Sequence, residues 1–182
     1  MKPALLAAFA AGVLAVVPAT PPLSAQSIRF GVGAGLQMPI GDYAGQDKLG
    51  WVAGGGGTYW LRSGKLGIRG DLSYAQTAHD TSGGSTKIFG AMASAVYALR
   101  TSAASARPYV MGGLGYYNVD IEVTPFPSAS ESKLGFAAGA GVSFRMGTGG
   151  KRWFAETRFT SVRTSGVSTT FFPIIVGISV GR

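Results

Sequence analysis

Apolar residues alternate with small or polar ones over unusually long stretches of this 182-residue chain. From Ile28 to Ile40, every even-numbered residue is apolar, whereas the odd-numbered ones are glycine, Arg29, Gln37 and Pro39. An α-helix cannot produce a period of two, because its side chains repeat every 3.6 residues. The stretch therefore predicts one long β-strand with two chemically different faces.

The same alternation recurs along the chain and predicts eight strands of about 11–13 residues. We expect them at residues 28–40, 51–61, 66–77, 87–99, 108–118, 134–146, 152–162 and 170–180. A tilted strand of about 9–11 residues crosses the apolar core of a bilayer, and closed bacterial barrels have an even number of strands. The predicted fold class is all-β: an eight-stranded antiparallel up-and-down transmembrane β-barrel.

The first residues are typical of a secretory signal peptide. Met1 and Lys2 precede an apolar stretch from Ala4 to Val17, and Ala25 offers a small residue at a cleavage site. A membrane helix is the alternative, but the stretch is shorter than the roughly 20 residues that a span needs. We expect residues 1–25 to be removed and residues 26–182 to form the outer-membrane barrel domain.

Composition excludes several kinds of function. The chain has no cysteine and one histidine, so neither a thiolate metal site nor a multi-histidine site fits within it. The glycine-rich stretch at 54–57 is followed by no Lys-Ser/Thr pair and no helix, so it is not a phosphate loop. The net charge is +8, but no recognition helix or aromatic basic groove accompanies it. We expect no cofactor and no nucleic-acid partner.

Charges divide into three groups when the expected strands are aligned. Short connections at 62–65, 101–106 and 147–151 alternate with mostly longer ones at 41–50, 78–85, 119–132 and 163–169, so the short ones and both chain ends are expected in the periplasm. That end carries nine basic residues and no acid: Arg29, Arg62, Lys65, Arg100, Arg107, Arg145, Lys151, Arg152 and Arg182. The other end has six acidic and four basic residues.

The third group lies within the expected strands, opposite the apolar face. Arg69 and Asp71 are two residues apart on the third strand, and Glu156 and Arg158 repeat that spacing on the seventh. Charges in a confined interior need partners, so we predict an ion-pair network that plugs the barrel. A gated polar path for small solutes is the functional alternative.

Aromatic residues gather near both ends of the expected strands, where membrane barrels carry belts of amphipathic rings. We assign Tyr59, Trp60, Tyr97, Tyr109 and Trp153 to the periplasmic belt. The outer belt is expected to contain Tyr43, Trp51, Tyr74, Tyr116, Tyr117, Phe171 and Phe172.

Several segments taken in order resemble the small outer-membrane β-barrel family of OmpA-, OmpX- and opacity-type proteins. They are residues 31–36 with 39–43, 69–74, 107–110 with 112–116, 139–142, 156–159 and 172–178. The resemblance implies a monomer in the outer membrane of a Gram-negative-type bacterium, with outer-membrane lipids and the barrel-insertion machinery as partners. It implies a structural, surface-interaction or minor small-solute transport role. Such barrels usually end in an aromatic residue, whereas this chain ends Val180-Gly181-Arg182.

Two other functions stay open. A soluble periplasmic barrel would enclose an apolar ligand, as lipocalin-like barrels do; the discriminating feature is which face of the barrel is apolar. A lipid-modifying barrel enzyme would need a nucleophile set, and His79 has Asp80, Ser82 and Ser85 nearby. That spacing is loose, so we expect a solvated loop histidine and no enzyme.

Overall fold

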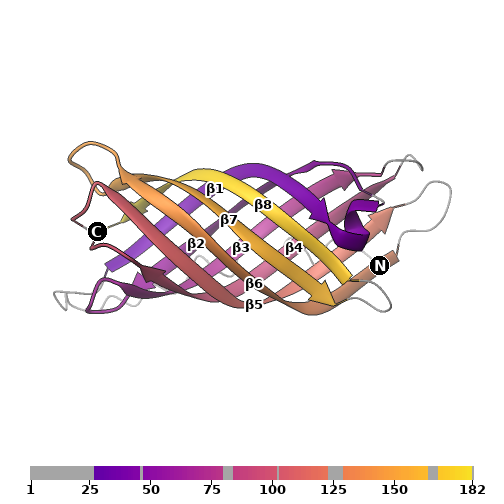
Figure 1. Ribbon diagram of the computed structural model, residues 1–182, viewed down its shortest axis with the longest axis horizontal. Helices are drawn as coiled ribbons and strands as arrows, with labels where there is room; N and C mark the ends of the chain where they lie inside the picture. Colours follow the sequence, from indigo (N-terminus) through magenta and orange to yellow (C-terminus); the bar gives the residue numbers. More distant parts are fainter. Residues whose placement is uncertain are drawn as a thin grey trace, which may run out of the picture.

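The computed structural model describes residues 27–45, 47–79, 84–101, 103–122, 129–163 and 168–181. Within them the chain forms eight antiparallel strands that close into one barrel (Figure 1). Each strand pairs with its neighbours in sequence, and β8 pairs with β1 to complete the ring. The predicted eight-stranded up-and-down barrel is confirmed. The predicted signal peptide, residues 1–25, lies outside the described residues.

The strands agree with the expected ones but run further at several ends. They are β1 (Ser27–Ile40), β2 (Gly50–Trp60), β3 (Leu66–Ala78), β4 (Ser85–Ala98), β5 (Ala106–Glu122), β6 (Ala129–Arg145), β7 (Lys151–Arg163) and β8 (Ser168–Gly181). A short 3-10 helix, η2 (Gly41–Gly45), follows β1. Across the described ranges, no helix is long and apolar enough to cross a membrane.

The two faces of each strand differ in exposure as the alternation predicts. On β1 the side chains of Phe30 and Val32 are exposed outside the barrel, while Arg29 and Gln37 turn inward. Leu114 and Leu134 are 70% and 72% exposed on the outer surface. An outward apolar band is what a barrel in a bilayer presents. The soluble alternative is therefore wrong, because it requires the apolar face inside.

The two ends of the barrel differ in their connections. Strands β2, β4, β6 and β8 finish at one end, here called the turn end (Figure 1, left). Strands β1, β3, β5 and β7 finish at the opposite end, the loop end. Gly64 and Gly147 have φ of 62° and 60°, a left-handed conformation that glycine adopts without a Cβ penalty.

The predicted contrast between short turns and long loops is largely wrong. Strands β5 and β6 are 17 residues each, so most of the expected loop at 119–132 is paired strand. Val119 pairs with Glu131, and Ile121 pairs with Ala129. This ladder provides partners for backbone groups that a loop would leave to water, which explains why the hairpin continues.

The charges divide between the ends as expected. Eight of the nine residues of the predicted basic group lie at the turn end, in strand ends or turns. Arg182 lies outside the described residues. At the loop end, Lys87 bonds Glu122 at 2.7 Å on the outer surface, and this hydrogen bond lowers the pKa of the Glu122 carboxyl.

The aromatic belts are only partly as predicted. Trp51, Tyr74, Tyr97, Tyr116 and Trp153 are exposed on the outer surface, with the rings of Trp51 and Tyr74 5.5 Å apart. Five other residues that were assigned to the belts are instead buried within the barrel: Tyr43, Trp60, Tyr109, Tyr117 and Phe171. Height along the barrel puts these residues near the membrane interfaces, but the period of two along each strand decides whether a ring points outward or inward.

Glycines of the barrel wall make room for these inward rings. A Cβ on Gly90 or Gly135 would come within 2.8 Å and 3.0 Å of the Tyr117 ring. A Cβ on Gly141 would lie 2.6 Å from Tyr109. The glycine-rich inner face therefore does not leave an open lumen, because aromatic side chains fill the space.

Candidate functional site

Four charged side chains meet inside the barrel, and all four are residues that the sequence singled out. Arg69 and Asp71 come from β3, and Glu156 and Arg158 come from β7. In the closed order of strands, β3 and β7 are four strands apart in either direction. The network formed by these residues, called here the lumen network, therefore joins opposite walls of the barrel.

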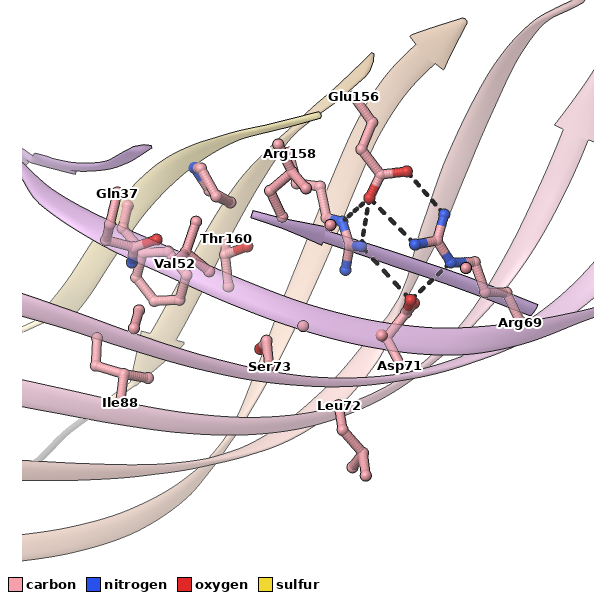
Figure 2. A pocket seen from close by; sticks show the side chains of 18 of the residues that line it. Gln37, Val52, Arg69, Asp71, Leu72, Ser73, Ile88, Glu156, Arg158 and Thr160 are labelled. Atoms are coloured by element: carbon pink, nitrogen blue, oxygen red, sulfur yellow. Dashed lines mark hydrogen bonds and ion pairs between the residues drawn. The ribbon is translucent and has the colours of Figure 1, made fainter. Parts of the chain in front are cut away.

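Arg69 links the two acids of the lumen network. Its Nη1 and Nη2 donate to the two carboxylate oxygens of Glu156 at 2.7 and 3.2 Å. Its Nε donates to Asp71 Oδ1 at 2.7 Å (Figure 2). The paired geometry of a guanidinium on a carboxylate is stronger and more directional than a single contact.

Arg158 completes the charge balance. Its Nη2 lies 2.5 Å from Glu156 Oε1 and 3.6 Å from Asp71 Oδ1. Two guanidinium groups thus face two carboxylates, and the side chains of Glu156 and Asp71 are 1% and 6% exposed. Buried charges are tolerated when they are paired and hydrogen-bonded in this way.

Two further side chains, which the sequence did not single out, join the lumen network. The Tyr109 hydroxyl on β5 donates to Glu156 Oε2 at 2.7 Å. Met92 on β4 places its sulfur 3.8 Å from Arg158 Nη1 and 3.6 Å from the Tyr117 hydroxyl. The alternation along β5 could have indicated Tyr109, because odd-numbered residues of that strand point into the barrel.

The lumen network separates two small cavities. The first, about 50 Å³, extends from the network toward the loop end and is lined by Gln37, Val52 and Ile88 (Figure 2). The second, about 60 Å³, lies toward the turn end. Arg69 lines both. At about 10–15 Å³ per water, each cavity holds only a few waters.

Gln37 lies deep in the first cavity. It is 1% exposed, and its amide oxygen and nitrogen have no hydrogen-bond partner among the described residues. An unsatisfied buried amide is costly, on the order of 1–3 kcal/mol. The cavity beside it is large enough for water to satisfy that amide.

A second polar cluster lies inside the barrel at the loop end, around His79. The His79 Nε2 is 3.0 Å from Thr86 Oγ1 and 3.8 Å from Asp47 Oδ1. Asp47 accepts hydrogen bonds from Thr77 at 2.6 Å and from Thr86 at 3.3 Å. Tyr43 of η2 lies 2.7 Å from the Thr77 hydroxyl, and burial raises the pKa of its phenol.

The structure changes the partners that the sequence suggested for His79. Ser85 is turned toward Glu122, with a 3.4 Å bond from its hydroxyl. Asp80 and Ser82 lie outside the described residues. The expectation that His79 is a solvated loop residue is wrong. Its side chain is 8% exposed, and its backbone forms an isolated antiparallel β-bridge with Asp47.

The profile of the outer membrane protein beta-barrel domain family matches residues 4–179. The chain belongs to this family. The match places the barrel in the outer membrane, in agreement with the exposed apolar band. No curated protein sequence shows a significant match to this outer-membrane barrel.

Solved structures of low sequence identity share the fold. The Neisserial surface protein A (NspA) is 14% identical, with a TM-score of 0.64 over 86% of this chain and 97% of that one. The N-terminal β-barrel domain of Pseudomonas aeruginosa OprF is 17% identical, with a TM-score of 0.54 over 86% and 97%. The outer membrane enzyme PagL is 15% identical, with a TM-score of 0.50 over 85% and 98%. At these identities the likeness concerns the fold alone.

Proposed function

We propose that this outer-membrane barrel is a closed structural and surface protein, which is neither a diffusion pore nor an enzyme. The observation that supports the proposal is the lumen network, which connects opposite strands β3 and β7 through four buried charges. An eight-stranded barrel is just wide enough for side chains to fill it. A network across that width leaves no continuous aqueous path.

The energy of the ion pairs supports a permanently closed lumen. Opening a path requires Glu156 to separate from Arg69 or Arg158 inside the barrel. Leaving a buried charge unpaired costs about 3–5 kcal/mol, so the closed arrangement is strongly favoured. A structural role is therefore favoured over minor transport of small solutes.

Conductance in planar bilayers tests this function. We expect the reconstituted wild-type barrel to show no stable pore conductance. The double variant Arg69→Ser/Arg158→Ser, which removes both guanidinium groups, is expected to conduct small ions if it folds. Arg62→Ser/Arg145→Ser removes the same charge from exposed positions at the turn end and should stay closed. A steady ohmic pore in the wild type contradicts the proposal.

The loop-end cluster supports a non-enzymatic role. Catalysis on a lipid requires a nucleophile that the substrate can reach, whereas Thr77 and Thr86 are each only 2% exposed. His79 faces the barrel interior rather than the lipid. We expect overproduction of the protein, or of its His79→Gln variant, to leave the mass spectrum of outer-membrane lipids unchanged.

The proposed orientation puts the turn end and both chain ends in the periplasm. With eight strands, the described chain enters and leaves the barrel at the same end. The loop end carries η2 and the long β5–β6 hairpin, and bacterial barrels extend further on their outer side. The basic turn end then faces anionic headgroups.

We infer a monomer inserted by the barrel-insertion machinery, with lipids as neighbours and no nucleic acid.

A further inference from the structure

A second group of arginines lies inside the barrel at the turn end. Arg29 of β1, Arg107 of β5 and Arg152 of β7 line the cavity of about 60 Å³, together with Trp60. Arg69 lines the cavity too, but its charge is already paired with Glu156 and Asp71. Among the described residues the lining contains no carboxylate. This cavity, called here the arginine cavity, is strongly positive.

Arg107 is the most informative member, because it is buried and has only neutral partners. It is 4% exposed. Its Nε donates to the carbonyl oxygen of Arg100 at 3.1 Å, and its Nη2 donates to the carbonyl oxygen of Gly64. Its guanidinium carbon lies 3.8 Å from the centroid of the Trp60 ring. Within the described chain it forms no ion pair, so its charge is available to an anion.

Arg29 brings a second positive charge close to the first. Its Nη1 donates to the carbonyl oxygen of Gly150 at 2.7 Å, and its Nη2 to that of Gly181 at 3.4 Å. Arg107 lies within electrostatic reach of both Arg29 and Arg152. Like charges held together in a confined space repel each other, so an anion between them is stabilised.

Trp60 gives a separate indication of a missing acceptor. The ring is 7% exposed, and its indole Nε1–H, a donor only, has no hydrogen-bond acceptor among the described residues. Leaving a buried donor unsatisfied is energetically unfavourable. The same ring carries Arg107 on its face, so this donor and the guanidinium belong to one wall of the cavity.

We propose that the arginine cavity binds a small oxyanion with the chemistry of a phosphate group. A volume of about 60 Å³ accommodates roughly four to six water-sized atoms, at about 10–15 Å³ each. A tetrahedral oxyanion, which is one central atom with its oxygens, is of that size. Guanidinium groups recognise such oxygens through charge-assisted hydrogen bonds, and the indole donor supplies a neutral one.

Isothermal titration calorimetry with inorganic phosphate tests this site. The full folded barrel is kept in dodecyl maltoside micelles, which contain no phosphate, at constant ionic strength. We expect saturable binding of one phosphate per barrel. Arg107→Gln removes the buried charge, and we expect binding at least about tenfold weaker, which corresponds to the loss of one charge-assisted hydrogen bond.

The matched control is Arg62→Gln, which removes one positive charge from an exposed turn position at the same end. Its affinity for phosphate should equal that of the wild type. Equal weakening in both variants, or no saturable binding to the wild type, would overturn the proposal. If Arg107→Gln does not fold, as judged by its gel mobility without boiling, Arg29→Gln and Trp60→Phe replace it, and each is expected to weaken binding.

A second arm identifies the source of the phosphate group. The titration is repeated in the presence of short-chain phosphatidylglycerol added to the same micelles. Competition by this lipid supports a headgroup as the ligand, and unchanged phosphate binding supports a free anion. Both results support the same chemistry, because both presuppose the saturable phosphate binding whose absence would overturn the proposal.

Discussion

Glu156 shows how much a single residue contributes to this barrel. Its carboxylate receives hydrogen bonds from Arg69, Arg158 and Tyr109, which come from three different strands. Sequence spacing placed Glu156 on an inward face but said nothing about Tyr109. The carboxylate is therefore the point at which β3, β5 and β7 are joined through side chains rather than backbone.

Glu156→Gln removes the charge while keeping the shape. We expect a loss of about 3–5 kcal/mol in the free energy of unfolding, because two buried guanidinium groups lose their carboxylate. Urea titration in lipid vesicles, followed by gel mobility without boiling, measures this change. Glu122→Gln, which breaks the exposed pair with Lys87, should have no resolvable effect. Equal stability of Glu156→Gln and wild type would contradict the role assigned to the lumen network.

Glycines of the wall differ sharply in what an added methyl group would meet. A Cβ on Gly113 would lie 2.1 Å from the carbonyl oxygen of Ala93, whereas a Cβ on Gly70 meets nothing within 4 Å. We expect Gly113→Ala to destabilise the barrel by about 1–3 kcal/mol through backbone displacement. Gly70→Ala should stay within about 0.5 kcal/mol of the wild type. The same urea titration compares the two alanine variants.

At the scale of elements, η2 (Gly41–Gly45) closes part of the loop end. The sequence predicted only a connection at 41–50, and a single buried side chain explains the helix. Tyr43 is 7% exposed and reaches the Thr77 hydroxyl on β3. Because Thr77 donates its proton to Asp47, Tyr43 is the donor in the Tyr43–Thr77 bond.

Tyr43→Phe removes this hydrogen bond and keeps the ring. We expect a loss of about 1 kcal/mol, the usual net value of one such bond, and faster proteolysis within residues 41–49. Tyr74→Phe changes an exposed ring and serves as the control. Burial raises the pKa of Tyr43 above its ordinary value of 10.0, so stability falls as the pH rises above about 10. That fall should be smaller in Tyr43→Phe; an identical pH dependence would contradict the burial of the phenol.

At the scale of the whole molecule, the barrel has two chemically different ends. Basic residues gather at the turn end, whereas the described acids outside the lumen network, including Asp47, Asp120, Glu122 and Glu131, lie at the loop end. Opposite ends in an asymmetric membrane meet different lipids and different compartments. The proposed orientation is therefore testable on intact cells.

The chain has no cysteine, so introduced ones are unique labelling sites. We expect Lys133→Cys at the loop end to react with a membrane-impermeant maleimide on intact cells. Lys65→Cys at the turn end should react only after the outer membrane is permeabilised. Both positions are solvent-accessible strand or turn residues, so a reversed pattern would mean that the barrel has the opposite orientation.

The local periodicity of the sequence determined the number of strands, which face of each is apolar, and that Arg69, Asp71, Glu156 and Arg158 point inward. This succeeded because a strand has a period of two and a bilayer requires an apolar exterior. Only the tertiary structure decided which inward residues meet: the lumen network across β3 and β7, the link from Tyr109, and the bridge between Asp47 and His79. Those contacts depend on the stagger and radius of the closed barrel, which bring together residues that are 87, 47 and 32 positions apart in the sequence.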